Sequence, residues 1–205
     1  MDSTPLSYLA LGDSYTIGER VAPELRWPVQ LVARLRESGE NVQEPVIVAR
    51  TGWTTDELEE GIRIADPQGP FDLVSLLIGV NNQYRGRDLD EYRTQLQALL
   101  ASAVAFAGGR PDRVFVLSIP DWGAMPFAQG RDREAIANQI DAFNRVKAEE
   151  VAALGIRYID ITDISRRVAG DSTMVAEDGL HPSGAQYALW AERALPAVEE
   201  LLGGT

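Results

Sequence analysis

The sequence predicts an α/β fold in which helices cover both faces of a parallel β-sheet. Three observations support it: short apolar segments alternate with helical patterns, two of those segments are almost continuously apolar, and no repeat or linker divides the 205 residues. Continuous apolar runs are typical of strands buried on both faces, which belong to parallel sheets. Because right-handed crossovers join such strands, we expect one domain over residues 1–205, a three-layer α/β/α sandwich with a flavodoxin-like five-stranded sheet.

The predicted strands are residues 6–11, 45–49, 71–78, 113–119 and 157–161, of which the third and fourth carry the almost continuous apolar runs. The predicted helices fill the gaps, at about residues 27–37, 54–64, 88–106, 132–154 and 183–202. Thr54 with Glu57, and Ser183 with Gln186, are candidate capping boxes for the second and the last helix. We expect Pro196 to kink or divide the last helix.

The carboxyl ends of parallel strands meet at one rim of the sheet, where ligands bind. This rule gathers residues 12–18, 50–54, 79–84 and 119–127 on the rim. In the first of these segments we expect the chain to turn at Gly12 and to present Ser14. That serine is either a nucleophile or a helix cap, which is the commoner role, and its immediate neighbours leave both readings open.

His181 is the only histidine, and it lies just before the last predicted helix. Asp178 is three residues earlier, across a turn that contains Gly179, so its carboxylate can accept the Nδ1 proton and leave Nε2 as a base. Taken alone, an Asp and a His at this spacing more often belong to a surface loop, where they only form hydrogen bonds with the backbone near the start of a helix. A single histidine excludes a metal site built on two or three imidazoles, and we expect neither a metal nor a cofactor.

Gly52 and Asn81 occupy the second and third rim segments. The N–H group of Gly52 can donate to a developing oxyanion, or Gly52 is a plain turn glycine with positive φ. Asn81 can offer a further donor, or it bonds only its own backbone, as Asn82 also can. Each feature is weak alone, but together with Ser14 and His181 they supply a nucleophile, a base and oxyanion donors.

This set of residues resembles the SGNH hydrolase (GDSL-like lipase/acylhydrolase) family over nearly the whole chain. The blocks that match, in the family's order and spacing, are Gly12-Asp13-Ser14-Tyr15, Gly52, Gly79-Val80-Asn81-Asn82 and Asp178-Gly179-Leu180-His181-Pro182.

The resemblance implies a role for each matching residue. Ser14 is then the nucleophile, His181 the base and Asp178 its orienting acid, and the oxyanion donors are the Ser14 and Gly52 N–H groups and the Asn81 side chain. Asn82 stands where the family usually has Asp, a change that concerns the support of the loop more than the chemistry. The serine lacks the G-x-S-x-G elbow of α/β-hydrolases, which counts against that fold.

We expect six residues to bind substrate: Trp53, Asn82, Tyr84, Trp122, Met125 and Phe127. The loop after the fourth strand can line an acyl pocket, or its apolar residues form a patch that only anchors the loop. Arg85, Arg87 and Arg131 can meet an anionic leaving group, although most arginines are simply solvated.

The composition limits the partners and the compartment. A net charge of −12 argues against nucleic acid or an anionic membrane surface as a partner. Lys147 is the only lysine, and the absence of cysteine excludes disulfides and a thiol nucleophile. The sequence shows neither a secretory leader nor a run long enough to span a membrane, so we expect a cytoplasmic protein without integral membrane association.

The expected function is that of a serine esterase or acylhydrolase, which cleaves small-molecule carboxylic esters through an acyl-enzyme and prefers short-chain or acetyl esters. The alternative is a non-catalytic ligand-binding domain on a flavodoxin-like fold, which has no reason to keep a serine, an acid and the sole histidine at these positions. A receiver domain needs paired acids after the first strand and a lysine after the last. A flavin site needs a denser phosphate-binding loop than Ser14 and Thr16 provide.

Overall fold

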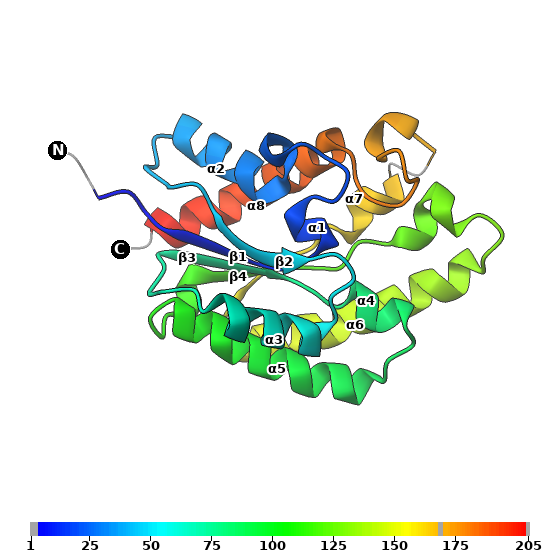
Figure 1. Cartoon of the computed structure of the whole chain (residues 1–205), viewed down its shortest axis with the longest axis horizontal. Helices are drawn as coiled ribbons and strands as arrows, with labels where there is room; N and C mark the ends of the chain where they lie inside the picture. The colour runs from blue at the N-terminus through cyan, green and yellow to red at the C-terminus, as the bar shows by residue number, and fades with distance from the viewer. Residues whose placement is uncertain (1–3, 168–169, 204–205) are drawn as a thin grey trace.

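Five parallel strands form one sheet in the order β2-β1-β3-β4-β5 (Figure 1). They are β1 (Tyr8–Asp13), β2 (Val46–Arg50), β3 (Leu73–Leu77), β4 (Val114–Leu117) and β5 (Arg157–Ile159). The computed structural model describes residues 4–167 and 170–203. Every residue of β1, β3 and β4 is buried, because these central strands are covered on both faces.

Helices lie on both faces of the sheet. Figure 1 shows α2 (Trp27–Glu37) and α8 (Gly184–Gly203) on one face, and α3 (Thr55–Ala65), α5 (Leu89–Phe106) and α6 (Arg133–Ala153) on the other. The predicted three-layer α/β/α architecture is therefore confirmed. Three short helices were not predicted: α1 (Ser14–Ile17), α4 (Val80–Tyr84) and α7 (Thr162–Arg167). Each has too few residues to show a helical period in the sequence.

Gly12 lies inside β1, so the prediction that the chain turns there is wrong. It pairs with Ala49 on one side and with Leu77 on the other. A Cβ atom at this position would come within 2.1 Å of the Thr16 Oγ1 atom and within 2.5 Å of the Leu77 carbonyl oxygen. Close packing therefore requires this glycine, and the strand continues to Asp13, immediately before Ser14.

The two predicted capping boxes have different outcomes. The first is present at the start of α3, where the Thr54 N–H group donates to the Glu57 carboxylate at 2.9 Å. The second is only half formed, because the Gln186 side chain donates to the carbonyl of Met174 at 2.7 Å instead of reaching back to Ser183. The Ser183 hydroxyl still accepts from the Gln186 N–H group at 3.3 Å. The Ser183 N–H group donates to the Met174 carbonyl at 3.0 Å, so a link to an earlier loop replaces the other half of the box.

Pro196 does not divide the last helix. Helix α8 continues through it to Gly203. Ala194 and Val198, on either side of the proline, are completely buried. Their packing against the rest of the core favours one continuous helix despite the hydrogen bond that proline cannot make.

Candidate active site

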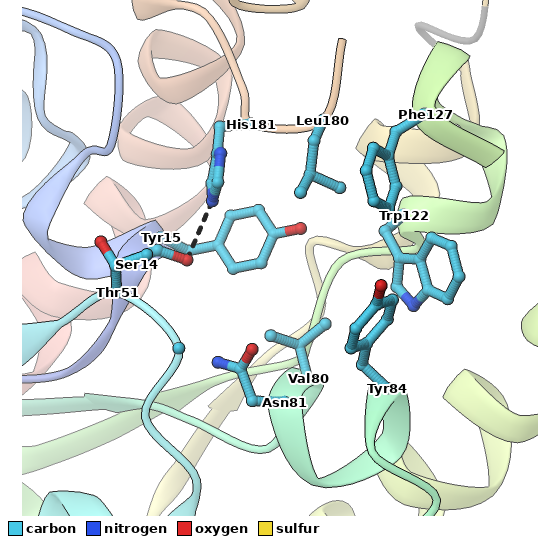
Figure 2. Close-up of a pocket in the computed structure, with 11 residues that line it drawn as sticks. Ser14, Tyr15, Thr51, Val80, Asn81, Tyr84, Trp122, Phe127, Leu180 and His181 are labelled. Carbon is cyan, nitrogen blue, oxygen red and sulfur yellow. Dashed lines mark hydrogen bonds between the residues drawn. The ribbon is translucent and has the colours of Figure 1, made fainter. Parts of the chain in front are cut away.

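Ser14, His181 and Asp178 meet at the carboxyl edge of the sheet. The Nε2 atom of His181 lies 3.0 Å from the Ser14 Oγ atom (Figure 2). Its Nδ1 atom lies 2.6 Å from Oδ2 of Asp178. An ionised carboxylate only accepts hydrogen bonds, so Nδ1 carries the proton and Nε2 accepts from the serine hydroxyl. In this arrangement a serine can lose its proton to the imidazole as it attacks an electrophile.

The turn that holds Asp178 keeps its carboxylate ionised. Its Oδ1 atom accepts the N–H groups of Leu180 and His181, each at 3.0 Å. Partial burial opposes ionisation, but the hydrogen bond from the His181 ring and these two backbone bonds outweigh it and lower the pKa of Asp178 below its ordinary value. The carboxylate therefore fixes the tautomer and the orientation of the imidazole.

The loop before α8 and the ring of Tyr15 hold His181 in place. The His181 carbonyl accepts from the Ala176 N–H group at 2.8 Å, and Val175 forms an isolated bridge with Pro182. The Tyr15 ring lies 5.4 Å from the imidazole, centroid to centroid, at a tilt of 53°. The imidazole is thus buried on one side and directed at the serine.

Asp13, and not Ser14, is the N-cap of α1. The Asp13 Oδ1 atom accepts from the Tyr15 N–H group at 3.0 Å. Because the cap is supplied by the preceding residue, the Ser14 hydroxyl is left for His181. Ser14 itself is almost completely buried, at 4% exposure, so its hydroxyl meets the cavity described below and little bulk water.

Gly52 and Asn81 line the same cavity as Ser14 and His181. Gly52 has a φ of 84°, which favours glycine, and its carbonyl accepts from the Arg85 guanidinium at 2.6 Å. The Asn81 Nδ2 atom donates to the Trp53 carbonyl at 2.9 Å. That bond uses one of the two amide protons and orients the group, so a second proton remains for a ligand.

A cavity of about 180 Å³ opens beside Ser14. Its lining is mostly apolar and consists of Ser14, Tyr15, Thr51, Gly52, Val80, Asn81, Tyr84, Trp122, Phe127, Leu180 and His181. Figure 2 shows Tyr84, Trp122 and Phe127 on the side opposite Ser14 and His181. We call these three residues the aromatic wall.

The members of the aromatic wall pack against one another. The ring of Trp122 lies 5.3 Å from that of Tyr84 and 6.1 Å from that of Phe127, at edge-on angles of 72° and 64°. The Trp122 indole N–H group donates to the Gln83 side chain at 2.7 Å, and the Phe127 N–H group donates to the Gly179 carbonyl at 2.9 Å. The wall is therefore fixed both to α4 and to the loop that carries His181.

Three of the six residues expected to bind substrate, Trp53, Asn82 and Met125, do not line the cavity. The Trp53 ring packs on α3, where a Cβ atom at Gly61 would come within 2.1 Å of it. Asn82 is completely buried and hydrogen-bonded to Thr55 through both ends of its amide. Met125 is buried beneath its loop, at 3% exposure. Each has a packing role in place of the expected contact.

Four lining residues were not expected from the sequence: Tyr15, Thr51, Val80 and Leu180. Each is a direct chain neighbour of Ser14, Gly52, Asn81 or His181, and adjacency to those motif residues was the available signal. Arg85 was considered only as a contact for an anionic leaving group, whereas it holds the Gly52 carbonyl.

Asp13, next to Ser14, and Lys147 are completely buried titratable groups that interact through their charges. Burial raises the pKa of Asp13 to about 7, although the bond from Tyr15 and the charge of Lys147 oppose this. Burial lowers the pKa of Lys147 to about 7 against the charge of Asp13, and its ammonium donates to the Leu117 carbonyl at 2.9 Å. Each group therefore reduces the cost of burying the other.

The residues in ranges 4–167 and 170–203 contain no group of three or more His, Cys, Asp or Glu side chains arranged to hold a metal ion. No helix in this part of the chain is long and apolar enough to cross a membrane.

Comparison with solved structures shows a shared fold. TesA superposes with a TM-score of 0.75 at 22% identity, covering 96% of this chain and 99% of TesA. The lipase/acylhydrolase from Enterococcus faecalis gives a TM-score of 0.69 at 24% identity and coverages of 96% and 95%. Axe2, an acetylxylan esterase from Geobacillus stearothermophilus, gives 0.71 at 20% identity, also with coverages of 96% and 95%.

The sequence itself carries the family assignment. A comparison with curated proteins found no significant match. The family model described as GDSL-like Lipase/Acylhydrolase family, however, matches residues 10–189, which include Ser14, Gly52, Asn81, Asp178 and His181. The chain therefore belongs to the GDSL-like Lipase/Acylhydrolase family, which makes it a carboxylic ester hydrolase.

Proposed function

We propose that this protein hydrolyses short-chain carboxylic esters through a covalent acyl-enzyme on Ser14. The observation that carries the proposal is the pair of contacts from His181, 3.0 Å to the Ser14 hydroxyl and 2.6 Å to the Asp178 carboxylate, beside an apolar cavity. A non-catalytic ligand-binding domain does not account for a serine and a histidine that line one cavity and are hydrogen-bonded to each other and to an acid behind them.

The proposed reaction has two steps. Ser14 Oγ attacks the ester carbonyl carbon as His181 Nε2 takes the hydroxyl proton, and the carbonyl oxygen becomes an oxyanion. The Ser14 and Gly52 N–H groups and the Asn81 amide are the proposed donors to that oxyanion. The tetrahedral intermediate collapses as His181 gives its proton to the leaving alkoxide, and a water molecule activated by His181 then cleaves the acyl-enzyme.

The size of the cavity supports short acyl groups. An engineered apolar cavity of about 150 Å³ holds a benzene molecule, and the cavity beside Ser14 measures about 180 Å³. It therefore suits an acyl group of up to about six carbon atoms, and an apolar chain longer than this has to leave the cavity over the aromatic wall. Axe2, one of the proteins that share the fold, is an acetylxylan esterase, and an acetyl group is well within this size.

The test is hydrolysis of p-nitrophenyl esters from acetate to decanoate by the wild type, Ser14→Ala and Ser38→Ala. We expect kcat/KM to fall for chains longer than about six carbons and kcat to drop by at least about 10⁴-fold in Ser14→Ala. Ser38 is exposed at the end of α2, so Ser38→Ala is the matched control and keeps full activity. Undiminished turnover in Ser14→Ala would contradict the nucleophile, and a preference for decanoate would contradict the proposed acyl size.

A further inference from the structure

Arg131 lies against the aromatic wall, in the loop that precedes α6. Its Cζ atom is 5.6 Å from the ring centroid of Tyr84, 5.2 Å from that of Trp122 and 5.1 Å from that of Phe127. One guanidinium thus contacts all three rings that close the cavity beside Ser14. A cation this close to an aromatic ring is attracted by the ring's quadrupole, so the three rings together hold the guanidinium at this place.

The contact with the rings leaves the hydrogen-bonding groups of this guanidinium unused. The rings attract its positive charge, whereas its five N–H donors form a planar fork that needs an acceptor. Within residues 4–167 and 170–203, the Arg131 side chain has no hydrogen bond or carboxylate partner. Arg85, by contrast, bonds Glu57 and the Gly52 carbonyl, and Arg87 bonds Glu91. Three arginines were considered for the site from the sequence. Among them, Arg131 is the one whose guanidinium N–H donors have no partner in the described part of the chain.

Arg131 borders a second cavity, of about 350 Å³, behind the aromatic wall. This cavity shares Tyr84 and Trp122 with the one beside Ser14 and is more polar. One carboxylate, that of Asp132, also borders it, but its Oδ1 atom caps α6 by accepting from the Ala135 N–H group at 2.9 Å. The Gln83 amide is occupied by Trp122 and by Gln139. The Arg131 guanidinium is therefore the cationic group of this lining, and its N–H donors are the ones left without a partner.

We propose that Arg131 forms a specificity subsite for a carboxylate at the far end of an ester substrate. The inference rests on the proposed ester hydrolysis at Ser14. A substrate that extends from Ser14 over the aromatic wall reaches the second cavity, where the guanidinium fork binds a carboxylate through two parallel hydrogen bonds. The carboxylate belongs either to the acyl group or to the alcohol, and the two sources are tested separately.

The acyl arm uses the mono-p-nitrophenyl esters of adipic and suberic acid, whose far carboxylate is free. Each is compared with the methyl p-nitrophenyl diester of the same acid, in which that carboxylate is a neutral methyl ester. Wild type is expected to prefer the charged ester, and Arg131→Gln to lose about tenfold in kcat/KM for it, mainly through KM, as expected when one charge-assisted interaction is lost. The alcohol arm makes the same comparison with 4-acetoxybenzoate and methyl 4-acetoxybenzoate. The arm that shows the loss identifies the source of the carboxylate.

Two further variants isolate the role of the fork. Arg131→Lys keeps the charge without the planar fork and recovers only part of the preference. Arg145 is exposed on α6 and far along the helix from this loop, so Arg145→Gln makes the same change of charge and leaves the preference intact. Arg145→Gln hydrolyses p-nitrophenyl butyrate like the wild type, and the charged-to-neutral ratio corrects for any change in basal activity in the Arg131 variants. An unchanged charged-to-neutral ratio in Arg131→Gln in both arms overturns the proposal.

A binding measurement separates failure of the subsite from failure of the proposed chemistry. Monomethyl adipate is titrated by calorimetry into Ser14→Ala and into the double variant Ser14→Ala/Arg131→Gln. Binding at least tenfold weaker to the double variant supports the subsite, whether or not any ester is hydrolysed. Equal binding by the two variants overturns it, even if the wild type hydrolyses every neutral ester.

Discussion

At the scale of single residues, the Asn81 amide is the part of the proposed oxyanion site whose orientation is clearest. Its Nδ2 atom donates to the Trp53 carbonyl at 2.9 Å, so the rotamer is set before any ligand arrives. A donor that is already oriented stabilises a transition state without the cost of reorganisation. Asn81 is therefore the residue on which the oxyanion proposal is most easily tested.

We expect Asn81→Ala to lower kcat by about 10² to 10³-fold, as the loss of one oxyanion donor does elsewhere. KM is expected to change little, because the interaction is made with the transition state. Asn81→Asp is nearly isosteric but places a negative charge beside the developing oxyanion, so it loses at least as much. Steady-state kinetics on p-nitrophenyl butyrate measures both, and wild-type kcat in either variant would remove Asn81 from the mechanism.

The residues of the candidate site that lie in motifs could be predicted from the sequence. The contacts that depend on which way a side chain points could not. Ser14, Asp178 and His181 were singled out because few residue types can serve as nucleophile, base and acid. The direction of the Trp53 ring depends on Gly61, eight residues further on, where the missing side chain makes room for it. Nothing near Trp53 in the sequence distinguishes a ring over α3 from a ring in the cavity.

At the scale of elements, Asn82 connects α4 to the start of α3. Its Oδ1 atom accepts from the Thr55 N–H group at 3.1 Å, and its Nδ2 atom donates to the Thr55 hydroxyl at 2.7 Å. That hydroxyl in turn donates to the Gln95 side chain. The amide thus fits a chain of donors and acceptors that a carboxylate cannot complete, since a carboxylate has no proton to give to Thr55.

Asn82→Asp, which restores the residue that resembling sequences usually have here, is therefore expected to destabilise this chain by about 1–3 kcal/mol, the cost of a buried hydrogen bond left unmade. Urea unfolding measures the change. Asn138 is exposed on α6, so Asn138→Asp is the matched control and leaves the free energy of unfolding nearly unchanged. Equal stability of Asn82→Asp and the wild type would show that Thr55 and Gln95 can rearrange.

The long helices and the buried strands were predictable because their apolar periodicity covers many residues. The short helices α1 and α4 were not, although they carry Ser14 and Asn81. Gly12 shows the same limit: a glycine at the end of an apolar run signals a turn, yet the close approach of Thr16 and Leu77 is what excludes a side chain there. Such contacts exist only once the strands have paired.

At the scale of the whole molecule, the buried charges of Asp13, beside Ser14, and of Lys147, on α6, make stability depend on pH. The pKa of Asp13 is raised from 3.8 to about 7, so between these two values the folded state binds more protons than the unfolded state. The contribution of Asp13 to stability therefore falls as pH rises through this window. The pKa of Lys147 is lowered to about 7, so above pH 7 the unfolded state binds more protons and stability rises with pH.

Lys147→Met removes the increase of stability with pH above pH 7. It also leaves the buried Asp13 carboxyl without an opposite charge. We expect the free energy of unfolding of the variant to fall below that of the wild type by an amount that grows by more than about 1 kcal/mol between pH 7 and pH 9, since one pKa unit corresponds to about 1.4 kcal/mol. Urea unfolding at pH 7, 8 and 9 gives both curves. Parallel curves would mean that the two groups do not titrate as a buried pair.

The global architecture was the most predictable level, because a parallel sheet needs only the alternation of apolar runs and helices. The Asp13–Lys147 pair was not predictable: Lys147 stood out only as the sole lysine, and 134 positions separate it from Asp13. The expected cytoplasmic location stays a prediction.

The central claim is that Ser14 becomes covalently bound to the acyl group, and labelling tests it most directly. The intact protein is treated with diethyl p-nitrophenyl phosphate, which reacts with a serine activated by a neighbouring base, and peptide mass spectrometry then locates the adduct. We predict one diethylphosphoryl group on Ser14, loss of ester hydrolysis in proportion to labelling, and no adduct in Ser14→Ala. Full inactivation with Ser14 unmodified, or the same labelling in Ser14→Ala, would contradict the account.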